Sequence, residues 1–140
     1  MPQATLKIST TGPGLYAFND QADSFVQSQD FQAGLLTCFV RHTSCSLVIQ
    51  ENADPDVRKD LDEFFRRLVP DATDPSMAWM RHTAEGPDDM PAHIKSALLA
   101  TSLSIPVMRG HLALGTWQGL YLFEHRRQPH QRQIVLHLSR

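Results

Sequence analysis

Cysteine is scarce in this chain, which has only Cys38 and Cys45 among 140 residues and no C-x-x-C spacing. A disulfide framework or a thiolate zinc site needs more cysteine than that, so the sequence predicts a protein of the reducing cytoplasm. No apolar run approaches the roughly 20 residues of a membrane span, and the N-terminal residues lack the pattern of an export signal. We therefore expect no membrane partner.

A strong charge of one sign is also missing. The 13 Lys and Arg against 15 Asp and Glu leave a net charge of -2, which provides no basic field for nucleic acid. The one basic stretch, residues 126–132, has no interleaved aromatic side chains, so no nucleic-acid partner is expected. The chain also lacks the G-x-S-x-G elbow of serine hydrolases and a P-loop. A small molecule is the expected substrate.

Length and apolar pattern predict a single domain over residues 1–140. A chain of this size buries about 68–70% of its unfolded surface on folding, which suffices for one core. Runs in which side chains alternate at a period of two predict strands, and the run 35–41 is apolar enough to be covered on both faces. The predicted strands cover residues 6–9, 35–41, 47–49, 103–107, 112–114, 116–123 and 134–138.

Two principal helices are expected between the outer strands. The first has Asp54 as N-cap and Pro55 as first residue, and Pro70 ends it. The second begins near Pro91 and follows a long polar connection over residues 70–90. The residues expected to face the core are Val57, Leu61, Phe64, Phe65 and Leu68 of the first helix and Ile94, Ala97 and Leu98 of the second.

A shorter helix is expected after Asn19, with Phe25 and Val26 on its inner face. Strands thus dominate both ends of the chain, and the principal helices lie between them. This order predicts an α+β fold with a mainly antiparallel, two-layered β-sheet.

Histidine is unusually frequent in the composition, with seven residues in the chain. Residues 81–93 hold His82, His93 and three carboxylates beside Gly86 and Pro87. Imidazoles and carboxylates are costly to bury unless they are paired, hydrogen-bonded or bound to metal, so this density indicates a site.

A divalent cation is the predicted occupant of that site. His93 falls in the first turn of its helix, where the helix dipole keeps the imidazole neutral and able to ligate. Catalytic zinc sites take three protein ligands and a water, and His42, His82 and His93 are the predicted ligands of zinc, or of Mg²⁺ if the protein is a transferase. The eleven-residue spacing of His82 and His93 matches no known metal motif. Hydrogen-bonded structural histidines are therefore the alternative.

The other polar residues expected near the predicted metal ligands form two sets, catalytic carboxylates and substrate-binding residues. Glu124, Asp89 and Glu85 are the predicted catalytic carboxylates, although Glu124 could instead form an ion pair with Arg126. The G-T-W-Q-G stretch offers an indole for stacking, although Trp117 could equally anchor the core. The predicted substrate-binding residues are Ser44, Lys95, Trp117, Gln118 and Arg126.

Three stretches make the chain resemble the YjbQ family, also labelled the secondary thiamine-phosphate synthase family. They are RHTSCSLVIQENADPDVRKDL, RHTAEGPDDMPAHIKSALL and SLSIPVMRGHLALGTWQGLYLFEH, the last with the Ser102, Gly110 and GTWQ pattern of the family. Cys45 stands where relatives commonly carry Ala, and Ala100 where Gly is usual.

The resemblance implies a compact α+β fold and a homotrimer, with His42, His82, His93 and Glu124 on the family's polar motif positions. Its label implies a secondary activity that joins a pyrimidine pyrophosphate to a thiazole phosphate, which would require a divalent cation and phosphate-holding residues. The leading hypothesis is a metal-assisted enzyme acting on a small phosphorylated or heterocyclic substrate. The alternatives are a non-enzymatic trimeric binder of a metabolite or metal, and a structural trimer whose histidines line the subunit interface.

Overall fold

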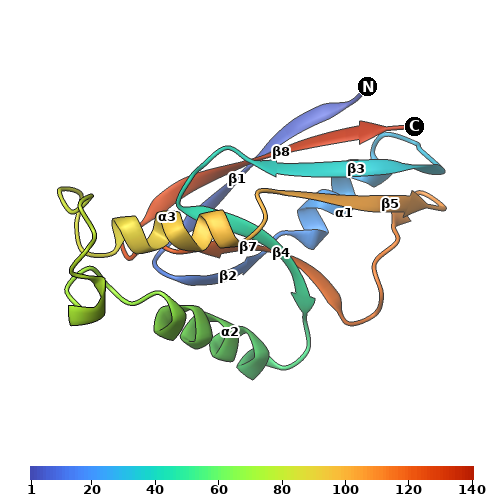
Figure 1. The fold of residues 1–140 in the computed structure, drawn as a ribbon. Coiled ribbons are helices and arrows are strands. Elements are labelled where there is room, and N and C mark those ends of the chain that lie inside the picture. The colour runs from blue at the N-terminus through green and yellow to red at the C-terminus, as the bar shows by residue number, and fades with distance from the viewer.

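Two antiparallel sheets and three helices make up the fold of residues 1–140, seen here in a computed structural model (Figure 1). Every strand pairing is antiparallel, which confirms the predicted α+β architecture. The elements in chain order are β1 (Gln3–Thr10), β2 (Gly14–Ala17), α1 (Asn19–Gln27), β3 (Ala33–Val40), β4 (Cys45–Glu51), α2 (Pro55–Leu68), the 3-10 turn η1 (Pro75–Met77), α3 (Asp89–Leu98), β5 (Ser102–Met108), β6 (His111–Leu112), β7 (Gln118–Glu124) and β8 (His130–Ser139).

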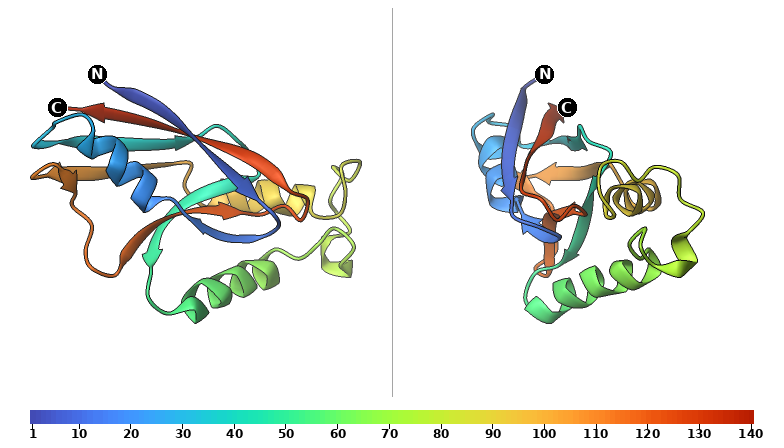
Figure 2. Two further views of the ribbon diagram at one scale, coloured as in Figure 1. Left: turned by 180° about the vertical axis from the view of Figure 1, so that it is seen from behind. Right: turned by 90° about the vertical axis from the view of Figure 1, so that its left-hand side faces the viewer.

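The two sheets enclose one core. The five-stranded sheet has the order β1-β8-β3-β5-β6 and the three-stranded sheet the order β2-β7-β4. The chain passes from the second sheet to the first between β7 and β8, and Figure 2 shows α1 on one side of the molecule with α2 and α3 on the other. Leu36, Cys38 and Val40 alternate inward from β3, as their period predicts, and meet Leu120 and Leu122 of β7 in the core.

The other face of β3 is open. Leu35 and Phe39 are 39% and 47% exposed, so the prediction that both faces of residues 35–41 are covered is wrong. The helices lie against the other sheet and the ends of the core, and no element of the chain covers this outer face (Figures 1 and 2).

The last strand starts earlier than its sequence predicts. Residues 126–133 read as a polar loop, yet β8 begins at His130 and its residues 130–137 pair with the whole of β1. Arg132 points inward there because its guanidinium binds the buried carboxylate of Glu124. A buried ion pair interrupts the apolar alternation by which a strand is detected. The short β2 also went unpredicted, because Gly12 to Gly14 reads as a turn.

Helix α2 begins as predicted but packs differently. The Asp54 side chain accepts a hydrogen bond from the Asp56 amide at 2.9 Å, and Pro55 takes the first helical position. No residue of α2 is buried, and Phe64 and Leu68 are 56% and 51% exposed. The prediction that the whole stripe is core packing is therefore wrong. Only its Val57, Leu61 and Phe65 side is half-buried.

Helix α3 turns a polar side inward. Its buried residues are Asp89, Pro91, Ala92 and Ser96, whereas Leu98 is 60% exposed. Ala97 is exposed as well, so the expected inward face of Ile94, Ala97 and Leu98 is wrong. The reason lies at the two ends of the buried face, where Ser96 donates to the Cys45 carbonyl and Asp89 meets Arg126.

Both cysteines are free thiols within the core. Burial raises the pKa of Cys38 and of Cys45 to about 12, so both are neutral at physiological pH. No thiolate is available from either, because each thiol is buried in apolar surroundings. None of the helices is long and apolar enough to cross a membrane.

The packing of two phenylalanines gives the first prediction. Phe18 is fully buried in the core, so Phe18→Ala should lower the free energy of unfolding by about 3–5 kcal/mol. Phe64→Ala, on the open side of α2, should change it by about 0.5 kcal/mol. Guanidinium denaturation of both variants measures the difference, and an equal loss for both would show that α2 packs more closely than described.

Candidate functional site

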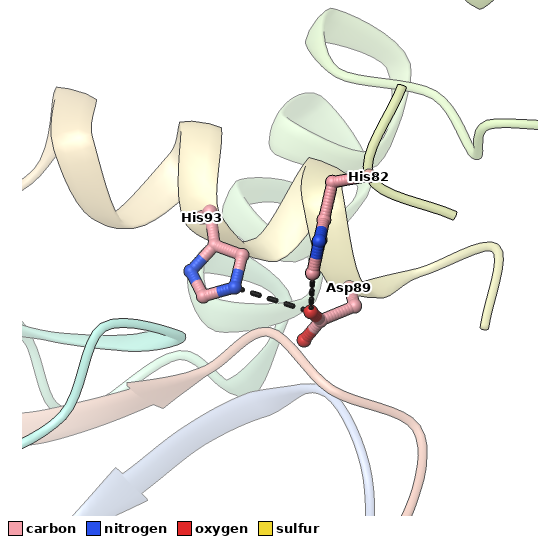
Figure 3. Close-up of side chains that lie close together, drawn as sticks. All are labelled: His82, Asp89 and His93. Carbon is pink, nitrogen blue, oxygen red and sulfur yellow. Dashed lines mark hydrogen bonds and ion pairs between the residues drawn. The ribbon is translucent and has the colours of Figure 1, made fainter. Parts of the chain in front are cut away.

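His82, Asp89 and His93 converge on one point at the start of α3 (Figure 3). His82 Nε2 lies 2.6 Å from Asp89 Oδ2, and His93 Nε2 lies 3.1 Å from the same oxygen. The three potential ligand atoms are all within 4.8 Å of one another. Two of the three predicted metal ligands are thus brought together, and a carboxylate predicted as catalytic joins them.

Local structure explains this convergence. Asp89 and His93 are four residues apart on α3, so they stand on the same helix face. His82 lies in the connection that precedes the helix, two residues after the buried Met80. The polar character of residues 81–93 therefore reflects a true cluster.

The proton on His93 decides what the cluster can hold. Its Nδ1 lies 2.8 Å from the Thr43 carbonyl oxygen, which can only accept, so Nδ1 carries the proton. In a neutral ring Nε2 then presents a lone pair to Asp89 Oδ2, which is also an acceptor. Two acceptors at 3.1 Å need a positive charge between them, either a proton on the imidazole or a metal ion.

Arg126 holds the other side of the same carboxylate. Its Nη1 is 2.5 Å from Asp89 Oδ1, its Nε is 3.1 Å from Asp88 Oδ2, and its Nη2 donates to the Glu85 carbonyl. Burial alone would raise the pKa of Asp89, but the hydrogen bond from His82 and the charge of Arg126 bring that pKa below its ordinary value. Asp89 is therefore ionised, with Oδ2 directed at the imidazoles.

The cluster is open to solvent on the histidine side. The Asp89 side chain is 2% exposed, whereas those of His82 and His93 are 42% and 32% exposed. A small ligand can therefore reach the imidazole edges, while the carboxylate that orients them stays buried.

His42 does not join this cluster, so the predicted three-histidine ligand set is corrected. Its Nε2 accepts a hydrogen bond from the Gln133 amide at 2.9 Å. Desolvation and the nearby Arg132 lower the pKa of His42, so the ring is neutral and carries its proton on Nδ1. It has no lone pair left for a metal, and it lies outside the group formed by His82 and His93.

Glu124 is a structural carboxylate in this geometry, which contradicts its prediction as a catalytic base. It is fully buried and accepts hydrogen bonds from Thr10 Oγ1 at 2.6 Å and from Arg132 Nε at 2.8 Å. The amides of His125 and Arg126 also donate to it. Burial opposes its charge, yet the hydrogen bonds from Arg132 and Thr10 bring the pKa of Glu124 below its ordinary value. It is saturated and cannot take a proton from a substrate.

Arg126 is the predicted substrate-binding residue that contacts the cluster, through Asp89, and the remaining ones do not gather around it. The hydroxyl of Ser44 is buried and accepts from Arg132, and Arg126 is bound to Asp88 and Asp89. Trp117 is 64% exposed and precedes β7, whereas Arg126 follows it. Seven strand residues separate the two ends by about 23 Å, so the indole is not part of this site.

Gln118 and Lys95 are also placed elsewhere, whereas Glu85 stays close. The Gln118 side chain accepts from the Gly115 amide and closes the turn before β7. Lys95 lies on another face of α3 from His93 and lines a small cavity towards α2. Glu85 has a carboxylate oxygen 3.9 Å from His82 Nε2 and is 66% exposed, which leaves it available for proton transfer.

The sequence comparisons agree with the fold. The family model described as "UPF0047 protein YjbQ-like" matches residues 4–140. The chain belongs to the YjbQ family. UPF0047 protein sll1880 of Synechocystis sp. is 53% identical over 98% of this chain and 90% of that protein. UPF0047 protein YjbQ of Escherichia coli O157:H7 is 42% identical over 98% of this chain and 96% of that one.

Solved structures of YjbQ-like proteins superpose on nearly the whole chain. The conserved hypothetical protein TT1486 from Thermus thermophilus gives a TM-score of 0.83 at 32% identity, covering 96% of this chain and 98% of that one. A YjbQ/UPF0047 family protein from Clostridium acetobutylicum gives 0.81 at 28% identity over 99% of each chain. These descriptions name no activity.

The sequence analysis does not predict two polar contacts of this YjbQ-family chain, between Asp89 and His93 and between Ser46 and His125. Asp89 is predicted as a catalytic carboxylate, although its spacing of four from His93 on a predicted helix also indicates a shared ligand. The buried contact between Ser46 Oγ and His125 Nε2, 2.9 Å long, joins residues 79 positions apart. No local pattern could have revealed that contact.

The buried Glu124–Arg132 pair gives the second prediction. Glu124→Gln leaves an uncompensated buried guanidinium, so it should lower the free energy of unfolding at pH 7 by about 3–5 kcal/mol. Because the pKa of Glu124 is lowered, the pair stabilises the fold above the ordinary carboxyl pKa and this stabilisation is lost as pH falls through the lowered value. The difference between the variant and wild type should therefore shrink in acid.

Denaturation curves at neutral and acid pH test this, with the exposed Glu85→Gln as control. That control should stay within about 0.5 kcal/mol of wild type. A Glu124→Gln protein as stable as the control would mean that the carboxylate is not the structural partner of Arg132.

Proposed function

We propose that this YjbQ-family protein is a metal-assisted enzyme in which His82, Asp89 and His93 hold a divalent cation. The observation that carries the proposal is the pair of facing acceptors, His93 Nε2 and Asp89 Oδ2, 3.1 Å apart. A cation between them would satisfy both. Two imidazoles and one carboxylate leave a coordination position for water or substrate, as in catalytic zinc sites.

The donor set favours zinc over Mg²⁺. Imidazole nitrogen suits zinc and similar transition metals, whereas Mg²⁺ prefers oxygen ligands and near-ideal octahedral geometry. Tetrahedral zinc with bonds of about 2.0–2.2 Å holds neighbouring ligands about 3.4 Å apart. The separations of 2.6 and 3.1 Å around Asp89 Oδ2 need only small rotations to reach that spacing.

The surrounding residues fit the role of outer partners to such a cation. The Thr43 carbonyl fixes the tautomer and the plane of His93, and Arg126 fixes Asp89 through its other oxygen. Bound there, a divalent cation supplies a Lewis acid for a carbonyl or phosphoryl oxygen. Glu85 is the carboxylate that can exchange a proton with a substrate held beside His82.

The substrate class we propose is a small phosphorylated or heterocyclic compound. Support comes from the secondary thiamine-phosphate synthase label attached to the resembled family, since a transfer between a pyrimidine pyrophosphate and a thiazole phosphate requires a cation. Exposure of the His82 and His93 edges suits a small ligand that approaches from solvent.

One observation favours the alternative, a non-enzymatic trimeric binder of a metal or metabolite. Glu124 is saturated and the hydroxyls of Ser44 and Ser46 are buried, so Glu85 is the one predicted catalytic group left open near the histidines. Turnover of phosphorylated heterocycles by the zinc-loaded protein distinguishes the two functions, since a binder would retain zinc without product formation.

Metal binding gives the third prediction. His93→Ala should abolish zinc binding and any transferase activity while leaving the fold intact, because the His93 side chain is partly exposed and packs little apolar surface. Isothermal titration with zinc, on protein purified without a His tag, measures the first effect, and a thermal melt measures the second.

The matched control is His111→Ala, which removes an exposed imidazole that contacts Asp23 far from the cluster. It should bind zinc as wild type does. Absence of zinc binding in the wild type, together with a large fall in the melting temperature of His93→Ala, would identify His93 as a structural histidine.

We also propose that the protein assembles as a homotrimer with the metal site near a subunit boundary. Support comes from the family resemblance and from the open outer face of the five-stranded sheet, where Leu35, Phe39 and Met108 are exposed. Light scattering at micromolar concentration should give a mass about three times that of the 15.8 kDa chain. A monomeric mass would contradict this prediction and leave the metal proposal standing.

A further inference from the structure

An apolar cavity lies beside β4, the outer strand of the three-stranded sheet. Its volume is about 410 Å³, and nine of its ten lining residues are apolar. Residues 47–50 of β4 form one side of it, Leu61 and Phe65 of α2 another, and residues 98–100, where α3 ends, a third. Pockets for small molecules have this size and this apolar character.

The edge of β4 that faces the cavity has no partner at Ile49. On this edge the Leu47 amide donates to the carbonyl of Ala100, a cavity residue, at 2.8 Å. Because alternate residues of a strand direct their backbone groups to the same edge, the N–H and C=O of Ile49 also point away from β7. The residue opposite Ile49 agrees, since the Leu120 carbonyl accepts from the Phe18 amide at 2.9 Å on the far side of β7.

The free part of this edge is one residue long. On one side of Ile49, the Leu47 amide is bound to Ala100. On the other side, the Glu51 amide donates to Gln50 Oε1 at 3.0 Å. An added β-strand uses a run of free backbone groups, whereas Ile49 offers one donor and one acceptor. The complement is therefore a small molecule rather than a strand of another chain.

The walls of the cavity define the rest of the ligand. No charged side chain lines it, so a charged ligand would lose its hydration without gaining a partner. Two aromatic rings in the wall, those of Phe65 and Phe123, meet edge to face with their centroids 5.6 Å apart. An uncharged aromatic ligand would displace water from these apolar surfaces and pair with both backbone groups of Ile49.

We propose that this cavity binds an uncharged, planar nitrogen heterocycle that carries a ring-nitrogen acceptor next to an N–H donor. The ring nitrogen accepts from the Ile49 amide, and the ligand N–H donates to the Ile49 carbonyl. Since a water molecule occupies about 30 Å³ in the liquid, the cavity has room for two fused rings. None of the lining residues belongs to the histidine cluster, so this site is independent of the proposed cation.

A matched pair of ligands tests the proposal on the unaltered protein. In a heteronuclear NMR titration near neutral pH, 7-azaindole should bind and shift the amide resonance of Ile49. Indole has the same shape and the same donor but a carbon in place of the acceptor, so it should bind about tenfold more weakly. Equal affinity for the two compounds, no binding of 7-azaindole, or shifts confined to residues outside the cavity would overturn the proposal.

Two leucine variants locate the site. Leu98→Gln puts a polar group into the apolar wall and should weaken 7-azaindole binding about fivefold. The matched control is Leu68→Gln, which changes a leucine of similar exposure on α2 that does not line the cavity, and it should bind 7-azaindole as wild type does. Zinc binding should be unchanged in both. An unchanged affinity in Leu98→Gln, or an equal loss in both variants, would contradict the assignment.

Ile49→Pro tests the backbone contact itself. Proline removes the outward N–H and is tolerated on edge strands, so the variant should lose the preference for 7-azaindole over indole. A tenfold preference that persists in folded Ile49→Pro would rule out this hydrogen bond. A thermal melt reports whether the variant folds, and the ligand pair on the wild-type protein decides the question if it does not.

Discussion

The architecture of the candidate site depends on the contact between the buried carboxylate of Asp89 and the guanidinium of Arg126. An ionised carboxylate that is 2% exposed needs a positive partner, since burial otherwise favours its neutral form. Arg126 follows β7 directly and binds Asp88 as well, so it ties the start of α3 to the end of the three-stranded sheet. Because Arg126 occupies one oxygen of Asp89, the other oxygen faces His82 and His93.

Two acid–base pairs lie at this end of the molecule, and their surroundings give them different roles. Glu124 and Arg132 join β7 to β8 across the two sheets, and every oxygen of Glu124 accepts hydrogen bonds. Asp89 shares its second oxygen only with two partly exposed imidazoles. The closed pair stabilises the fold, whereas the open pair can exchange its imidazole contact for a ligand. Burial alone does not separate these roles, since both carboxylates are buried.

Helix α3 presents polar groups on two faces. The face with Asp89 and His93 supports the proposed cation, and the face with Asp88 and Lys95 lines a small charged cavity towards α2. Consecutive residues of a helix point about 100° apart, so neighbours as close as Asp88 and Asp89 serve different surroundings. Arg126 binds both and couples the two faces electrostatically. The buried residues of α3 include the polar Asp89 and Ser96, whereas its apolar Leu98 is exposed.

Side-chain periodicity in the sequence predicts the strands around Leu36 and Leu136, and the capping pattern predicts the start of α2 at Asp54 and Pro55. The density of polar residues predicts that His82 and His93 share a site. All three signals act over a few residues, which is why the sequence alone reveals them. Long-range contacts decided the rest. The amide of Gln133 takes the lone pair of His42, and Arg132 saturates Glu124. Whether an imidazole or carboxylate is free for chemistry depends on which donors the fold brings to it, and those donors lie up to 114 positions away in the chain.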